Sequence, residues 1–213
     1  MEDDALLGVL AAELARAHGC HTVIVYGSRA RGDATAGSDW DLAGIRAEAP
    51  RLRDARRVHG ALLDAFVYPD AAIDELGPEL LKLTGGRVVF EQGGAGARWL
   101  ARAAEIEARG PEPLPPDEEA AIRAWVPKML ARAARGDVEG DFRRAWLVVQ
   151  LLDDYFRLRG RFYRGPKESL AWLAVNDPPV RAAFERALAP GAPLAAIAAL
   201  AALVLEETAK LGP

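Results

Sequence analysis

VIVYGSRARGDATAGSDWDL, residues 23–42, joins two apolar runs through a loop rich in glycine and charged side chains. Its first residues are mostly β-branched, which is typical of a buried strand, and its last residues open a second apolar run that predicts another strand. Between the two runs the chain reads Gly-Ser, then ten residues, then Asp-x-Asp. This stretch predicts two strands that meet at a polar loop.

The two aspartates of that loop, Asp39 and Asp41, lie two positions apart at the start of the second strand. Residues two apart on a strand point to the same face, so both carboxylates are expected to converge while Trp40 faces the other way. Neighbouring carboxylates repel each other unless they share a proton or a cation. Mg²⁺ takes one or two carboxylates together with phosphate oxygens. The pattern therefore predicts a magnesium site for a phosphate-bearing substrate, with Asp39 and Asp41 as ligands.

A third acid, Asp64, lies inside the otherwise apolar run ALLDAFVY, residues 61–68. An acid without a partner in such a strand is costly. If this strand neighbours residues 39–45, Asp64 supplies the third carboxylate of a site with two metal ions and becomes the candidate catalytic base. A salt bridge is the alternative interpretation. The arginines that could form it are Arg51, Arg53, Arg56 and Arg57.

The Gly-Ser pair, Gly27 and Ser28, is predicted to bind phosphate, because glycine allows close approach to the backbone and the hydroxyl and N–H groups bind anions. Arg29 and Arg31 follow with forked donors that suit phosphate oxygens. Asp33 is expected to be a turn or cap residue. The nucleotide-binding candidates of this loop are therefore Gly27, Ser28, Arg29 and Arg31.

With Asp64, these motifs resemble the nucleotidyltransferase fold of the DNA polymerase β superfamily, in its small bacterial branch. The resemblance covers about residues 5–108. It implies transfer of a nucleoside monophosphate, with ATP as the expected donor, to a hydroxyl group with release of pyrophosphate. It also implies two Mg²⁺ ions held by Asp39, Asp41 and Asp64.

The expected fold class is α/β (α+β), a small mixed sheet flanked by helices, followed by a C-terminal all-α bundle. Residues 1–108 form the predicted catalytic domain, residues 109–116 a proline-rich linker, and residues 117–213 the helical bundle. The expected strands cover residues 22–26, 39–45, 61–68 and 87–92. The expected helices cover residues 3–18, 70–83, 96–108, 117–135, 140–159, 166–175, 178–188 and 193–210.

The order of domains is similar to that of aminoglycoside and kanamycin nucleotidyltransferases, so the bundle is a predicted acceptor-binding domain. Its stretch 153–173 mixes basic and aromatic side chains, which can hold phosphate and stack a base. Lys167 is the predicted nucleotide contact and Tyr163 the predicted substrate contact. The alternative is a solvated basic face over a core. Asp153 and Asp154 could bind a cationic acceptor, but helix-surface charge is the favoured interpretation.

The composition limits the expected cellular compartment and the expected partners of the protein. The single cysteine, Cys20, excludes an internal disulfide and is expected to be a small buried residue in a cytoplasmic protein. No signal pattern opens the chain, and the longest apolar run, residues 194–205, is too short to cross a bilayer. The net charge is -4, and neither half of the chain has the excess of basic residues that is typical of a bulk polyanion binder, so nucleic acid is not an expected partner.

The expected partners are a nucleoside triphosphate, a hydroxylated acceptor and, as one option, a second copy of the chain. The alternative function is a toxin–antitoxin nucleotidyltransferase that modifies a protein partner. A polymerase or tRNA-end-adding enzyme is disfavoured because the second half has no broad basic surface.

Overall fold

The computed structural model describes residues 2–206. The chain divides into two compact units, Met1–Arg109 and Gly110–Pro213. The division falls at the proline-rich stretch that the sequence places between its two halves.

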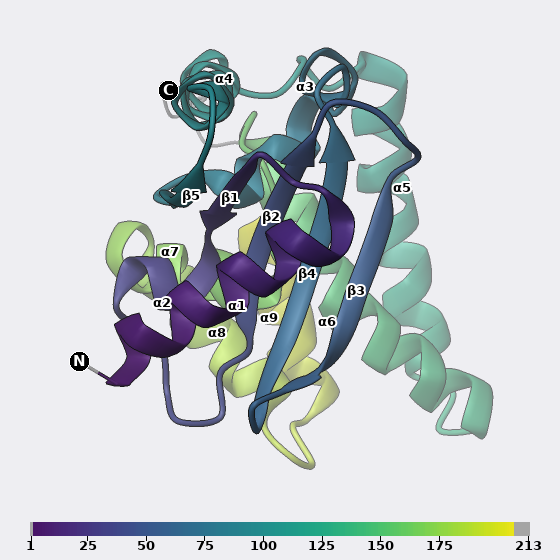
Figure 1. Ribbon diagram of the computed structural model, residues 1–213. Helices are drawn as coiled ribbons and strands as arrows, with labels where there is room; N and C mark the ends of the chain where they lie inside the picture. The colour runs from purple at the N-terminus through teal and green to yellow at the C-terminus, as the bar shows by residue number, and fades with distance from the viewer. Residues whose placement is uncertain (1, 207–213) are drawn as a thin grey trace. The chain divides into compact units, whose positions relative to one another are not determined.

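The first unit is built on a five-stranded mixed sheet with the strand order β3-β4-β2-β1-β5 (Figure 1). The strands β2 and β4 pair in parallel, and the other pairs are antiparallel. This sheet confirms the mixed sheet expected from the sequence. The strands are β1 Thr22–Val25, β2 Trp40–Arg46, β3 Leu52–Val58, β4 Ala61–Pro69 and β5 Arg87–Glu91.

One face of the sheet is covered by helix α1, Glu2–His18, which crosses it in Figure 1. Leu10 and Leu14 of this helix are fully buried, and they belong to the same apolar cluster as Trp40 and Leu42 of β2. Trp40 therefore faces the α1 side, as the period of two requires. Asp41 consequently projects from the opposite face.

The opposite face carries the 3-10 segment η1, Gly77–Leu83, and helix α4, Ala95–Arg109. Trp99 of α4 is fully buried, and its ring lies 5.7 Å from that of Tyr68 in β4. This packing covers the far end of β4 and leaves its beginning, at Asp64, partly accessible.

Three local predictions differ from the structure. The strand β3 was not expected, because its charged sequence LRDARRV lacks an apolar run. The single helix expected over residues 70–83 is instead a short helix α3, Ala72–Glu75, followed by η1. Gly77 has a φ of 49° and Pro78 has no N–H to donate, so a continuous helix is not possible there. The short helix α2, Gly27–Arg31, was also not expected.

The second unit contains five helices and no strand over residues 110–206. They are α5 Pro116–Ala133, α6 Val138–Leu158, α7 Gly165–Asn176, α8 Pro178–Leu188 and α9 Leu194–Leu205. They share one apolar cluster, which includes Met129, Leu147, Phe184 and Leu200. The end of the helix expected over residues 193–210 lies outside the described residues.

Two arginines donate hydrogen bonds to the carbonyl groups at the C-terminal end of α9. Arg159 is buried and donates hydrogen bonds to the carbonyls of Leu203 and Val204, both at 3.1 Å. Arg123 donates to the carbonyl of Leu205 at 2.6 Å. Because the last carbonyls of a helix have no partner within it, these bonds anchor α9 to the unit. Arg159 belongs to the stretch 153–173, whose basic side chains were expected to hold phosphate or to form a solvated face. It is instead buried and structural.

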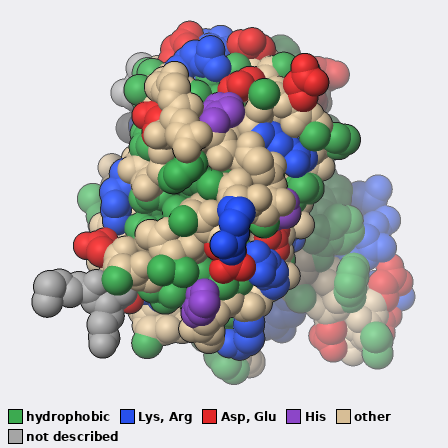
Figure 2. All heavy atoms as spheres, in the orientation of Figure 1, with side chains coloured by type: hydrophobic (Ala, Val, Ile, Leu, Met, Phe, Trp, Pro, Cys, Tyr) green, Lys and Arg blue, Asp and Glu red, His purple; other side chains and the backbone are tan. Residues whose placement is uncertain are grey.

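Within residues 2–206, none of the helices combines the length and the apolar character that a bilayer-crossing segment requires. On the face that Figure 2 shows, acidic and basic side chains are interspersed, and neither sign forms a continuous patch. Cys20 is buried, as expected, and burial raises the pKa of its thiol to about 11.

Candidate functional site

Asp41 and Asp64 are register partners in the parallel pair β2·β4. Partners on adjacent strands project from the same face, so the two carboxylates lie side by side on the face away from α1. This confirms the expectation that the two acidic strands are neighbours. Both side chains are partly accessible.

Gly27 lies directly against Asp41. Its φ of 68° belongs to the left-handed region, and a Cβ atom on this residue would overlap the Asp41 carboxylate. The amide of Tyr26 also donates to the Asp41 carbonyl at 3.0 Å. Glycine at position 27 is therefore required both by its backbone conformation and by the space that the Asp41 carboxylate occupies. Ser28, the next residue, is buried at the start of α2.

Arg53 of β3 forms a two-point ion pair with Asp64. Its Nε donates to Oδ1 at 2.7 Å and its Nη2 donates to Oδ2 at 2.8 Å, so each oxygen of Asp64 accepts one hydrogen bond. The Arg53 guanidinium also lies 5.2 Å from the ring centroid of Phe66. The salt bridge that the sequence offered as an alternative role for Asp64 is therefore present. The predicted metal-binding and catalytic roles of Asp64 stay predictions.

Lys82 of η1 extends over the same face of the sheet. Its ammonium lies 3.8 Å from the ring centroid of Phe66, and it donates a hydrogen bond to the Tyr68 hydroxyl. Burial lowers the pKa of Lys82, and the carboxylates of Glu79, Asp64 and Asp41 oppose this effect. Burial also raises the pKa of Tyr68, to about 12. A lysine in this position is a fixed cation beside the acidic pair.

The remaining residues of the loop take different positions. Asp39 precedes β2 and is exposed. Arg29 donates to Asp3 at 2.8 Å and to the Ser38 carbonyl at 3.0 Å, and it lies 4.3 Å from the Trp40 ring centroid.

Arg29 thus lies with Trp40 on the face of β2 opposite Asp41, where it has a packing role. Arg31 pairs with Asp33 at 3.4 Å, which agrees with a local role for Asp33. The nucleotide contacts expected of Arg29 and Arg31 remain predictions.

A metal ion fits part of this donor set. Asp41 and Asp64 supply the one or two carboxylates that Mg²⁺ takes from a protein, and Gly27 provides the space that the Asp41 carboxylate occupies. Across residues 2–206, however, no three His, Cys, Asp or Glu side chains are grouped closely enough to hold a metal ion. The set Asp39, Asp41 and Asp64 is therefore not assembled in this structure, and Arg53 covers the oxygens of Asp64.

Sequence reasoning did not identify Lys82 as part of the site, and it considered Arg53 only as a salt-bridge partner. The sequence contains two features that point to this face of the sheet and to Lys82. Asp64, Phe66 and Tyr68 alternate along one strand and therefore share a face. A lysine within the apolar run LLKL, residues 80–83, must place its charge somewhere polar.

The predicted contacts of the second unit have unequal environments. Tyr163 is half-buried and its ring lies 6.4 Å from that of Phe156, while Lys167 is exposed in the first turn of α7. Asp154 is buried, which corrects its assignment to the helix surface, and its Oδ1 accepts a hydrogen bond from Gln150 at 3.1 Å. Burial raises the pKa of Asp154.

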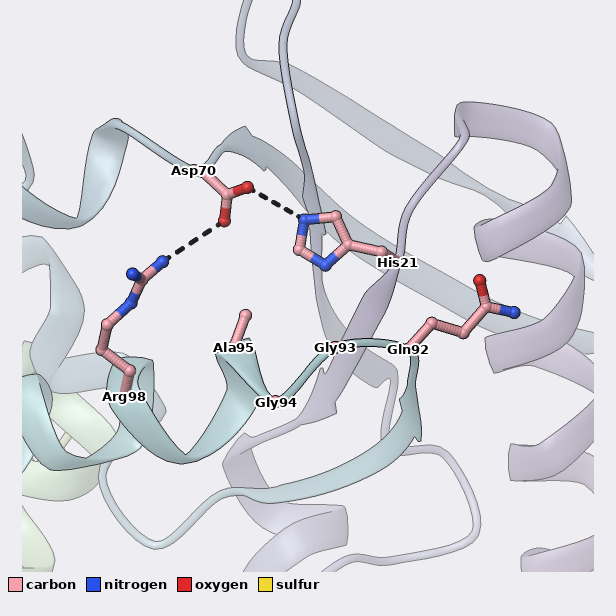
Figure 3. Close-up of a pocket in the computed structure, with 7 residues that line it drawn as sticks. All are labelled: His21, Asp70, Gln92, Gly93, Gly94, Ala95 and Arg98. Carbon is pink, nitrogen blue, oxygen red and sulfur yellow. Dashed lines mark hydrogen bonds and ion pairs between the residues drawn. The ribbon is translucent and has the colours of Figure 1, made fainter.

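A polar pocket of about 300 Å³ lies at the other end of β1 (Figure 3). Asp70 there hydrogen-bonds His21 at 3.1 Å and pairs with Arg98 at 3.6 Å. The Glu91 carboxylate accepts from the Gly96 amide at 2.6 Å, which satisfies part of the N-terminal end of α4. This pocket contains none of the residues predicted from the sequence motifs.

No protein-family model matches this chain, and no curated protein does. Among solved structures, the chain is similar to a nucleotidyltransferase-like protein from Exiguobacterium sibiricum, with a TM-score of 0.41 and 15% sequence identity. The match covers 91% of this chain and 70% of that one. A similarity of this degree does not identify a function.

Proposed function

We propose that this chain is a nucleotidyltransferase of the DNA polymerase β superfamily. It transfers a nucleoside monophosphate, AMP from ATP, to a hydroxyl group of a small acceptor and releases pyrophosphate. The acceptor belongs to the class of polar, hydroxylated and cationic molecules that includes aminoglycosides. The proposal rests on the sequence motif and on the geometry of one sheet face.

The observation that carries it is the register pairing of Asp41 with Asp64 beside a glycine without room for a side chain. Two carboxylates side by side repel each other. Arg53 offsets the charge of Asp64, and a bound cation would offset the charges of both acids. Mg²⁺, when bound, supplies charge neutralisation at the phosphate oxygens. Asp39 and Asp41 are its proposed ligands, with Asp64 as the third.

In the proposed reaction, the acceptor oxygen forms a bond to the α-phosphorus as the bond from that phosphorus to the pyrophosphate oxygen breaks. Asp64 receives the hydroxyl proton. To do so, a carboxylate oxygen of Asp64 must first be released by Arg53, because each oxygen accepts a hydrogen bond from it. Gly27 and Ser28 hold the phosphates through backbone and hydroxyl groups, with Arg29 and Arg31 as further proposed contacts.

The second unit is proposed to bind the acceptor and part of the nucleotide. Lys167 is exposed and free to follow a phosphate group, and the hydroxyl of Tyr163 is suited to a polar acceptor. These two roles rest on the order of domains and on residue chemistry.

The test is incubation with Mg²⁺ and ATP, CTP, GTP or UTP, each labelled at the α-phosphate, across a panel of hydroxylated acceptors. We expect label on a small molecule, with loss of the signal in Asp41→Asn. Asp33→Asn is the matched control, because Asp33 is an exposed acid of the same loop. Transfer that persists in Asp41→Asn contradicts the proposal. So does a failure of the unchanged protein to transfer label from any of the four donors to any acceptor. Label on protein supports the toxin–antitoxin alternative instead.

A further inference from the structure

Two basic side chains share one aromatic ring beside the acidic pair. The guanidinium of Arg53 and the ammonium of Lys82 lie 5.2 Å and 3.8 Å from the ring centroid of Phe66. The two cations are therefore at most about 9 Å apart, the sum of these distances. They come from β3 and η1, on either side of β4 in the sequence.

The two cations are held differently. Lys82 is half-buried, donates to Tyr68 and faces the Phe66 ring, so its charge is confined to one place. Arg53 is mostly exposed and forms an ion pair with Asp64. Exposed ion pairs contribute little free energy, so Arg53 can exchange this partner for another anion at small cost.

The charge balance of the cluster points to the ligand. Arg53 and Lys82 place two positive charges near the two negative charges of Asp41 and Asp64. A divalent cation on the carboxylates leaves an excess of positive charge, which an anion must compensate in a partly buried site. Two cations that lie within about 9 Å of each other at one ring can contact the same extended anion through several of its charged oxygens.

We propose that Arg53 and Lys82 form a binding site for the phosphate chain of the nucleotide, in which Lys82 is the fixed contact and Arg53 moves from Asp64 to phosphate oxygens. This inference rests on the proposed function for the identity of the ligand. It assigns phosphate binding to the face of the sheet that carries Asp41 and Asp64, in addition to the Gly27-Ser28 loop. It also explains how Asp64 becomes available in the loaded site.

The test measures binding of inorganic tripolyphosphate by calorimetry in excess Mg²⁺, with no acceptor and no nucleotide. We expect Lys82→Met and Arg53→Gln each to weaken binding by about tenfold, the effect of losing one hydrogen bond to a charged group. The matched controls are Lys128→Met, an exposed lysine of α5, and Arg57→Gln, an exposed arginine of β3. Both controls are expected to bind within about twofold of the unchanged protein, because neither residue lies at the Phe66 ring.

Circular dichroism establishes that each variant is folded. If Lys82→Met does not fold, Arg53→Gln still decides the matter, because Arg53 is mostly exposed. Unchanged affinity in a folded Arg53→Gln or Lys82→Met variant overturns the proposal, as does a failure of the unchanged protein to bind tripolyphosphate. Tripolyphosphate binding that depends on both residues, without nucleotide transfer to any acceptor, refutes the proposed function and leaves this inference standing.

Discussion

Asp64 accepts one hydrogen bond at each carboxylate oxygen from Arg53, while its register partner Asp41 lies against Gly27. Asp64 must therefore exchange this basic partner for any other ligand. The Asp41 carboxylate occupies the space that Gly27 leaves without a side chain.

Removing Arg53 is expected to strengthen metal binding. Arg53→Gln frees the oxygens of Asp64. An exposed ion pair contributes little free energy, so the expected gain in metal affinity is at most about fivefold. Titration with Mn²⁺, followed by the electron paramagnetic resonance of the free ion, measures the change. Arg57→Gln is the control on the same strand. An unchanged or weaker Mn²⁺ affinity in Arg53→Gln contradicts the competition.

Two glycines allow a matched test of the space at Asp41. Gly27 and Gly32 have φ values of 68° and 80°, so alanine at either position costs about 1–2 kcal/mol in the left-handed region. A Cβ at Gly32 meets nothing within 4 Å, whereas one at Gly27 overlaps Asp41. We expect both variants to lose stability in urea unfolding and only Gly27→Ala to lose Mn²⁺ affinity and transfer activity. Equal Mn²⁺ affinity in the two variants would refute the role given to this space.

The buried guanidinium of Arg159 is expected to stabilise the second unit. Arg159→Met removes donors to the carbonyls of Leu203 and Val204 and leaves these groups without those partners. The expected loss is about 2 kcal/mol, the range for hydrogen bonds to charged groups. Thermal unfolding measures it, with the exposed Arg186→Met as control. Equal losses in both variants would show that the anchoring of α9 contributes nothing specific.

The stability of the protein should depend on pH through Asp154. Burial raises the pKa of this carboxyl above its ordinary value, so its ionised form costs stability at neutral pH. That cost disappears as the pH falls through the raised pKa toward about 4, the ordinary value for aspartate. We expect the stability of Asp154→Asn, measured relative to that of the unchanged protein, to be higher at pH 7 than near pH 4. Thermal unfolding across this range tests it, with Asp141→Asn, an exposed acid of α6, as control. A difference that is constant with pH would contradict the assignment.

Cys20 is expected to be unreactive in the folded protein. Burial raises the pKa of its thiol to about 11, and only the thiolate reacts with disulfide reagents. At about pH 8, where a free cysteine reacts readily, the native protein should consume no reagent. The guanidinium-unfolded protein should consume one equivalent, corresponding to its one cysteine. Rapid reaction of the native protein would place the thiol at an accessible position.

The fold was predictable where side-chain patterns are strong. The β-branched run of β1, the apolar run that begins at Trp40 and the acid within ALLDAFVY predicted three strands and the proximity of Asp41 to Asp64. The convergence expected of Asp39 was not found, because Asp39 precedes β2 and is exposed. The charged strand β3 was missed because its residues lie on an edge of the sheet, where pairing with β4 rather than burial makes the strand. The break at Gly77-Pro78 was readable from residue chemistry, but the surrounding helical pattern concealed it.

The motif residues and their chemistry follow from local sequence, because strand period and glycine conformation depend on near neighbours along the chain. The pairing of each basic side chain with an acid does not follow from local sequence. Arg53 reaches Asp64 through the antiparallel register of β3 and β4, Lys82 reaches Phe66 through the turn of η1, and Arg29 is held on the opposite face by Asp3 and Trp40. Four neighbouring arginines were equivalent partners for Asp64 in sequence. Strand pairing selected one, because side-chain proximity across a sheet is set by register and face rather than by separation along the chain.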